Sequence, residues 1–219
     1  MFVGHIALGL AAKRITPRVS LAVLIAAAQT ADMLWPVFVA MGLEQVRIDP
    51  GNTAFTPLDF VSYPYSHSLV TLILWGLVFA AGYRAVARQN GRTFVVLSAL
   101  VVSHWVLDWI THGPDMALAP GNPTKLGLGL WNSIAGTLIV ELALYGAGVW
   151  LYLRATRPID RAGRRGTMAL VAFLLIAYFA AAFGPLPPTI VAVAIGMLIL
   201  TVILVAWAQW VERHRAMSR

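Results

Sequence analysis

The sequence predicts an all-α membrane protein, a polytopic bundle of six transmembrane helices plus a short N-terminal half-span helix. Three observations predict this fold. The 219 residues are 59% hydrophobic and only 11% charged, whereas about a quarter of the residues in a soluble domain are charged. Six apolar stretches are each long enough to cross a bilayer, which takes about 20 residues. The basic residues lie in short groups between these stretches.

The apolar stretches predict one integral membrane domain over residues 1–219, with the site-bearing helices in 1–153 and a scaffold hairpin in 166–211. Residues 2–12 are too short to cross and are predicted as a half-span or re-entrant helix. The sequence GPLPP at 184–188 predicts a tight turn between the last two spans. The six predicted spans are residues 19–43, 65–83, 93–112, 128–153, 167–183 and 189–211.

The positive-inside rule predicts the orientation of these spans, because six crossings place four basic groups on the same face. That face is predicted to be cytoplasmic and to include the C-terminus, and the final ERHRAMSR is predicted as a solvated tail. Only Arg47 and Lys125 fall outside the groups. The groups are Lys13, Arg14 and Arg18; Arg84, Arg88 and Arg92; Arg154, Arg157, Arg161, Arg164 and Arg165; and Arg213, Arg215 and Arg219.

Composition excludes several classes of site and partner. The chain has no cysteine, so disulfides and thiolate metal sites are excluded. The net charge of +7 reflects membrane orientation and attraction to anionic lipids, and no nucleic acid is expected as a partner. The outer loop at 44–64 is predicted to be irregular and to cover the mouth of the bundle. Trp35, Trp109 and Trp131 are predicted as interface anchors.

Six ionisable residues fall inside the predicted membrane segments, where an unpaired charge costs about 3 kcal/mol or more. With a rise of about 1.5 Å per residue, His104 and Asp108 lie roughly 18 and 24 Å from Arg92. The same count places the others at similar depths in the outer half of the membrane, so we expect them to converge. The six residues are His5, Asp32, His67, His104, Asp108 and Glu141.

Histidine and carboxylate side chains together form a ligand set for zinc, or for manganese or iron if oxygen ligands dominate. In SHWVLDWITHGPD, residues 103–115, His104 and Asp108 lie four apart on one helical face and can chelate one ion. Two residues, Glu141 and Asp32, are candidates for the catalytic general base. The predicted metal ligands are His67, His104, Asp108 and His5.

The last part of this stretch is predicted as the rim of the site, on the substrate's access route. His112 and Asp115 reach the outer interface, where Gly113 and Pro114 end the helix. Other interpretations stay open: a solvated helix end for these two residues, a packing hydrogen bond for any one residue of the cluster, and proton or ion conduction for the whole cluster. For Glu141, a further open interpretation is that it pairs with Asn132, Ser133 or another polar group of the bundle and has no catalytic role.

Three short motifs resemble the YdjM-like, inner-membrane-bound metal-dependent hydrolases of bacteria. They are GHIALGL near the N-terminus, SHS at 66–68 and SHWVLD at 103–108. The resemblance covers residues 2–115, implies a site at His5, Asp32, His67, His104 and Asp108, and implies the bacterial inner membrane. The chain departs from the family in QTADMLWP, which has Leu34 where a second Asp would fall, and in PYSHS. The number of metal ions therefore stays open.

Two functions follow from these residues. The first is a membrane-embedded hydrolase in which metal-activated water attacks a lipid or lipid-linked ester or phosphoester from the periplasmic half of the bilayer. The alternative is an ion- or proton-coupled transporter that uses the same cluster, although the sequence shows no inverted repeat. A transport pathway in so short a chain would need a homo-oligomer. A structural metal in an assembly factor is a third interpretation.

Overall fold

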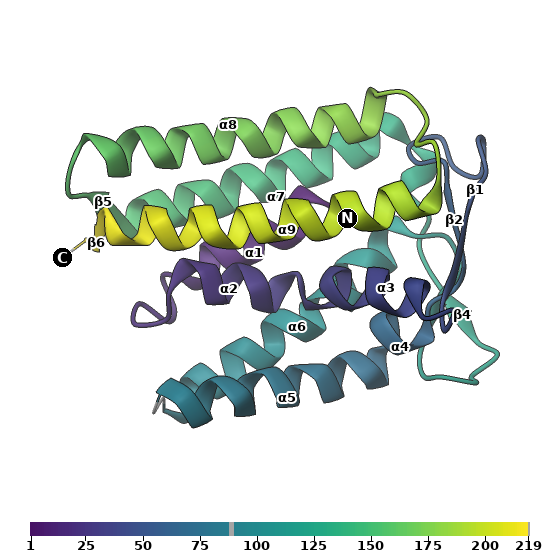
Figure 1. Cartoon of the computed structure of the whole chain (residues 1–219), viewed down its shortest axis with the longest axis horizontal. Coiled ribbons are helices and arrows are strands. Elements are labelled where there is room, and N and C mark those ends of the chain that lie inside the picture. Colours follow the sequence, from purple (N-terminus) through teal and green to yellow (C-terminus); the bar gives the residue numbers. More distant parts are fainter. Residues whose placement is uncertain (88–89, 219) are drawn as a thin grey trace.

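Five helices among the described residues, 1–87 and 90–218 of this computed structural model, are long and apolar enough to cross a membrane (Figure 1). The predicted all-α polytopic bundle is therefore confirmed. Two of the basic residues named above, Arg88 and Arg219, lie outside the described residues. The five helices are α5 (Leu69–Ala87), α6 (Gly91–Thr111), α7 (Ile134–Ala155), α8 (Arg161–Phe183) and α9 (Ile190–Arg213).

The sixth crossing is broken in the middle. Helices α2 (Leu21–Ala28) and α3 (Thr30–Ala40) meet at Gln29 with a bend of 54°. The predicted span over residues 19–43 therefore corresponds to this bent pair of helices. The break places the C-terminal carbonyls of α2 and the first turn of α3, which carries Asp32, at the same level inside the bundle.

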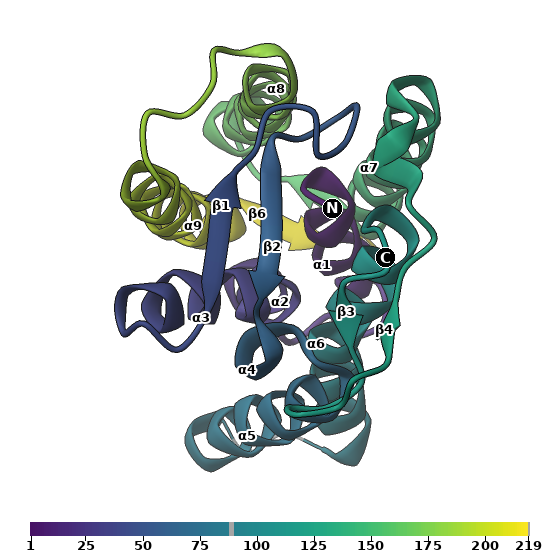
Figure 2. The ribbon, with the colours of Figure 1, turned by 90° about the vertical axis from the view of Figure 1, so that its right-hand side faces the viewer.

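Helix α1 (Val3–Ala12) is a half-span helix enclosed by protein. It lies at the centre of the bundle, between α2, α6 and α7 (Figure 2). Two glycines allow this close packing: Gly9 of α1 approaches the backbone of Leu24, and Gly148 of α7 approaches the backbone of Ala7. The predicted short helix is therefore buried in the bundle, and its first turn lies between the two ends of the molecule.

One end of the bundle, which we call the basic end, carries the loop of residues 13–20, the C-terminal end of α5 and the chain's C-terminal segment (Figure 1). Strand β5 (Thr156–Pro158) pairs there with β6 (Arg215–Met217). The Arg215 side chain is buried and donates hydrogen bonds to Thr156 and Thr167. The prediction of a solvated tail is wrong at Arg215, because these bonds hold its side chain against the bundle, whereas Arg213 and Ser218 are exposed.

The opposite end, which we call the hairpin end, is covered by short strands. β1 (Gln45–Ile48) and β2 (Leu58–Ser62) form an antiparallel hairpin, so the predicted irregular loop contains regular structure. The hairpin turn is fixed to the bundle by a hydrogen bond from Phe55 N to Trp131 O, 3.0 Å long. The remaining elements of this end are α4 (Pro64–His67), β3 (Met116–Ala117), β4 (Lys125–Leu126) and the 3₁₀ helix η1 (Leu130–Asn132).

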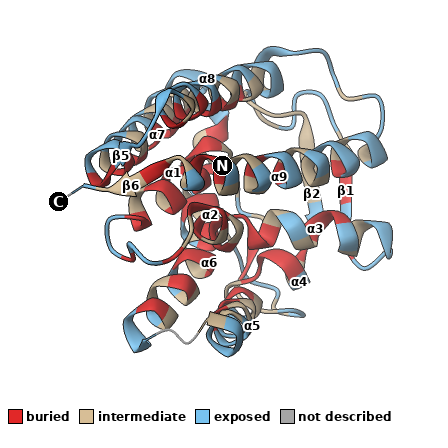
Figure 3. Ribbon diagram, turned by 60° about the vertical axis from the view of Figure 1, so that its left-hand side comes forward, coloured by how far each residue is buried: buried red, intermediate tan, exposed pale blue. Residues whose placement is uncertain are grey.

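Burial separates the helices into two groups (Figure 3). Helices α1 and α2 are mostly buried, whereas α5, α8 and α9 expose long rows of apolar side chains, as membrane-facing helices do. Two of the tryptophans predicted as interface anchors, Trp35 and Trp131, are only 1% and 8% exposed. That prediction is wrong for both, because their rings pack inside the hairpin end.

The contact between α1 and α7 gives a direct test of this packing. A Cβ atom at Gly148 would lie 2.5 Å from the carbonyl oxygen of Ala7, so we expect Gly148→Ala to lower the free energy of unfolding by about 1–3 kcal/mol. The measurement is thermal unfolding in detergent. Gly146→Ala is the matched control, since no described atom lies within 4 Å of that Cβ. Equal stability of the two variants would contradict the close approach.

Candidate metal centre

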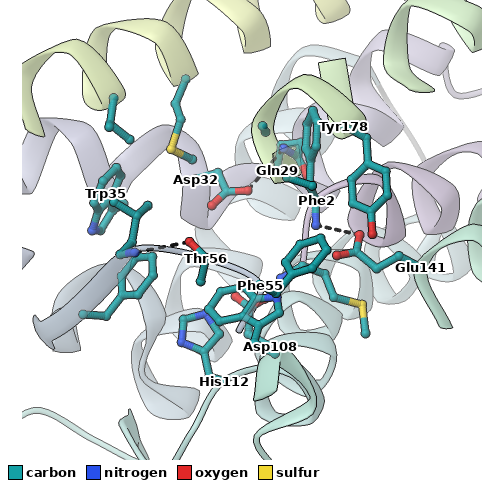
Figure 4. A pocket seen from close by; sticks show the side chains of 18 of the residues that line it. Phe2, Gln29, Asp32, Trp35, Phe55, Thr56, Asp108, His112, Glu141 and Tyr178 are labelled. Atoms are coloured by element: carbon teal, nitrogen blue, oxygen red, sulfur yellow. Dashed lines mark hydrogen bonds and ion pairs between the residues drawn. The ribbon is translucent and has the colours of Figure 1, made fainter. Parts of the chain in front are cut away.

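Five of the predicted site residues meet inside the bundle, between the basic and hairpin ends. They come from four helices. His5, Asp32 and His67 lie near an end of their helices, whereas His104 and Asp108 lie within the long helix α6. Asp32 and Asp108 line one cavity (Figure 4). The five residues are His5 on α1, Asp32 on α3, His67 on α4, and His104 and Asp108 on α6.

Four of these side chains have the spacing of a metal site. The Nε2 atom of His104 lies 3.1 Å from Asp108 Oδ2 and 3.6 Å from Asp32 Oδ1. The Nε2 atom of His67 lies 3.7 Å from Asp32 Oδ1 and 3.8 Å from Asp108 Oδ2. Ligand atoms around a tetrahedral zinc ion, with bonds of 2.0–2.1 Å, are about 3.3 Å apart. Asp32, His67 and His104 form a group whose ligand atoms all lie within 4.8 Å of one another, and Asp108 faces both imidazoles of this group, so the four side chains are candidates to hold one ion.

The hydrogen bond at the other ring nitrogen fixes the tautomer of His104. Its Nδ1 lies 2.9 Å from the carbonyl oxygen of Ala28, at the C-terminal end of α2. A carbonyl oxygen only accepts, so Nδ1 carries the proton. In the neutral ring the lone pair is then on Nε2, and it faces Asp108 and Asp32. Among the described residues this buried Nε2 atom has no hydrogen-bond partner.

A relay of two side chains fixes His67 in the same way. The buried carboxylate of Glu44 accepts hydrogen bonds from the backbone N–H of Ser66 and from its hydroxyl, at 2.8 and 2.6 Å. Because the hydroxyl proton of Ser66 is given to Glu44, its oxygen accepts from His67 Nδ1, 2.6 Å away. The lone pair of the neutral His67 ring is therefore also on Nε2, on the side of the carboxylates.

These tautomers create an arrangement that needs a cation. Two imidazole lone pairs and two carboxylates face one another, and all four are acceptors. The amino group of Met1 offsets part of the charge of Asp108 from the side of its other oxygen, but the acceptors that face one another repel unless a positive charge lies between them in this setting of low dielectric. A divalent ion satisfies all four ligands at once, and the donor types are those of zinc. The residues present therefore fit a metal ion.

His5 lies at the edge of this set of four. Its Nε2 is 3.0 Å from Asp108 Oδ1, the oxygen that His67 and His104 do not face, and its ring stacks on His104 at 3.6 Å. The amino group of Met1 also contacts this oxygen. These contacts give His5 the geometry of a second-shell partner that holds Asp108. A second group, His5 with His104 and Asp108, also has its ligand atoms within 4.8 Å of one another.

Glu141 lies apart from the metal cluster but lines the same cavity. Its carboxylate accepts hydrogen bonds from the backbone N–H groups of Phe2 and Gly4, at 2.9 and 3.3 Å. It therefore caps the first turn of α1, and the hydroxyl of Tyr178 points toward it (Figure 4). The other candidate base, Asp32, belongs to the ligand set, where Gln29 Nε2 donates to its second oxygen at 3.3 Å.

The predicted rim residues form a network of their own at the hairpin end. His112 Nδ1 lies 3.1 Å from both the Tyr63 hydroxyl and Asp115 Oδ1. Burial and the nearby Asp115 carboxylate raise the pKa of Tyr63, which keeps its proton and donates it to Asp115 at 2.5 Å. His112 is buried against the ring of Trp131 and lines the cavity, whereas the Asp115 side chain is about a third exposed.

The cavity beside the cluster has a volume of about 250 Å³. One of its walls is formed by α8 and α9, through residues such as Ala182 and Met197. The helical hairpin of α8 and α9, which the sequence predicts as scaffold over residues 166–211, therefore takes part in the site. Sequence reasoning also missed Glu44, Ser66 and Gln29, which hold the predicted ligands. Their position next to a predicted ligand or span end was the only available signal.

Comparison of the chain with protein-family models, with curated proteins and with solved structures gives no match.

The relay to His67 predicts a measurable change in metal affinity. We expect Glu44→Gln to weaken zinc binding about 10- to 100-fold, as the loss of a second-shell partner does. The measurement is competition between the purified protein and a zinc chelator of known affinity. Asp49→Asn is the matched control, because Asp49 is an exposed carboxylate of the same outer segment. Unchanged affinity in Glu44→Gln would contradict the relay.

Proposed function

We propose that the protein is a membrane-embedded metal-dependent hydrolase of the YdjM-like kind. The observation that carries this proposal is the set of two imidazole lone pairs and two carboxylates at metal-ligand spacing, at the end of a cavity. The proposed substrate is a lipid or lipid-linked ester or phosphoester, because the cavity lies in a bundle of membrane-crossing helices. The proposed setting is the periplasmic half of a bacterial inner membrane, with the basic end and the C-terminus cytoplasmic.

Each residue has a proposed part in this reaction. His67, His104, Asp32 and Asp108 would hold the ion, which, with one position left open to water, would supply a hydroxide near neutral pH. Glu141 is the carboxylate of the cavity that is not in this ligand set, and we assign it as the general base that accepts the water proton and passes it to the leaving group. The cavity opening at the rim, where Asp115 is partly exposed, admits the polar part of the substrate.

Metal content tests the ligand assignment before any substrate is known. We expect about one zinc ion per chain in the wild-type protein and a large loss in His104→Ala and Asp32→Ala, because each removes one of four ligands. Elemental analysis of detergent-purified protein is the measurement. His214→Ala is the control, since His214 lies at the basic end and pairs with Asp160. Metal-free wild-type protein, or a His104→Ala protein with full metal, would reject the assignment.

The assignment of Glu141 is tested by separating metal binding from turnover. We expect Glu141→Gln to retain its metal and to lose hydrolysis by roughly 10²- to 10⁴-fold, the usual effect of removing a general base. Hydrolysis is measured on lipid esters and phosphoesters in mixed micelles. The neutral amide still accepts from the N–H groups of Phe2 and Gly4, so α1 keeps its cap. Full activity of this variant would remove Glu141 from the mechanism.

Ion-coupled transport is a second candidate, and one observation favours it. The helix break at Gln29 lies beside the ionisable cluster, as broken helices do at the binding sites of transporters. Uptake of zinc or protons into vesicles that contain the protein, abolished in Asp108→Asn and without hydrolysis of any lipid, would support transport over the hydrolase. Hydrolysis without uptake would reject it.

A further inference from the structure

The cavity beside the metal cluster has an apolar half that the proposed chemistry does not use. At its polar end are the cluster residues, and at its other end the side chains come from α8 and α9. Two of them, Tyr178 and Thr201, carry a hydroxyl: that of Tyr178 points toward Glu141 (Figure 4), and that of Thr201 donates to the carbonyl oxygen of Met197 in its own helix. This half therefore offers a ligand mainly van der Waals contact. Its residues include Tyr178, Ala181, Ala182, Val193, Met197 and Leu200.

Helices α8 and α9 contact each other directly in the half of the bundle nearer the basic end. The ring of Trp210 lies where Gly166 has no side chain, and the rings of Phe173 and Trp207 are 5.6 Å apart. Nearer the hairpin end, the cavity lies between the two helices, which are joined beyond it by the loop of residues 184–189 (Figure 2). The seam therefore has direct helix contacts and a surface hollow of about 430 Å³ beside Gly166 and Trp207 near the basic end, and the cavity beside the cluster near the hairpin end.

The part of this seam near the hairpin end adjoins the outer surface. An outer hollow of about 450 Å³ lies between the turn of the β1–β2 hairpin and the loop after α8. The cavity and this outer hollow share six residues as walls: Phe55, Thr56, Leu58, Ala181, Ala182 and Val193. The surface around them is apolar, since Phe183 and Leu186 are both more than half exposed. A route that has apolar side chains and two threonines, Thr53 and Thr56, along it thus leads from the surface at the hairpin end, beside α8 and α9, toward the cluster.

We propose that the α8–α9 half of the cavity binds the acyl chain of a membrane lipid, which enters sideways between these two helices. A chain that moves from the bilayer into this cavity exchanges one apolar environment for another, so it is never exposed to water. The headgroup remains at the hairpin end, and the bond near it reaches the cluster. The claim that this lipid is the substrate rests on the proposed hydrolase function, whereas the claim that the chain binds there does not.

Photochemical crosslinking tests the binding directly. The full chain is reconstituted in vesicles that contain a phosphatidylcholine with a diazirine near the end of one acyl chain, and adducts are mapped by mass spectrometry. We expect adducts on Met197 or Leu200 of the cavity in addition to residues that face the bulk lipid, such as Ile139. Ala182→Trp fills the cavity wall, so the cavity adducts fall several-fold while those on Ile139 stay unchanged.

The controls separate this proposal from the hydrolase proposal. Ala172→Trp makes the same change on the exposed side of α8 and should leave the cavity adducts intact. His104→Ala should also retain them, because chain binding does not need the metal. Ala182→Leu replaces the Trp variant if the latter fails to fold. Adducts confined to lipid-facing residues in the wild-type protein, or unchanged cavity adducts in Ala182→Trp and Ala182→Leu, would overturn the proposal whatever the metal analysis gives.

Discussion

The need to neutralise two carboxylates inside a membrane bundle governs the arrangement of this protein. Asp32 and Asp108 lie where an isolated charge costs several kcal/mol, and both face the Nε2 atom of His104. The side chains around them are imidazoles whose protons are held on the far side by Ala28 and Ser66. The protein thus places several hydrogen-bond acceptors around one point. This arrangement suits a bound cation, whereas without one the buried acceptors destabilise the fold.

Interrupted helices make this gathering possible. An unbroken span exposes no backbone hydrogen-bonding group, whereas α1, α2, α3 and α4 each begin or end near the cluster. The break after α2 supplies the carbonyl that orients His104, and the amide groups of the first turn of α1 are satisfied by Glu141. Irregular backbone at membrane depth is tolerated only where protein or a polar cavity surrounds it. Here the bundle surrounds all of these ends.

The parts of the site that could be predicted from the sequence are those set by helical geometry. The four-residue spacing of His104 and Asp108 fixes a shared face, and counting residues from the basic groups indicates a common depth. The role of Glu44 could not be predicted, because it depends on how an outer segment folds back onto Ser66. The break at Gln29 has no Gly or Pro beside it. The cavity wall of α8 and α9 is also hidden, because cavity-lining and lipid-facing apolar residues look alike in a sequence.

The central position of α1 has a consequence for how the chain is made. Its ten residues cannot cross the bilayer, and its packing surface is completed by α7, where Gly148 meets Ala7. About 140 residues separate these two positions, so at 5–20 residues per second α1 waits roughly 7–30 s for its partner during synthesis. Throughout that time the amide groups of Phe2 and Gly4 have no Glu141 to bind, and His5 has to wait for Asp108 in the same way. Helix α1 is therefore synthesised well before α7, and it can complete its packing only after α7 has entered the membrane.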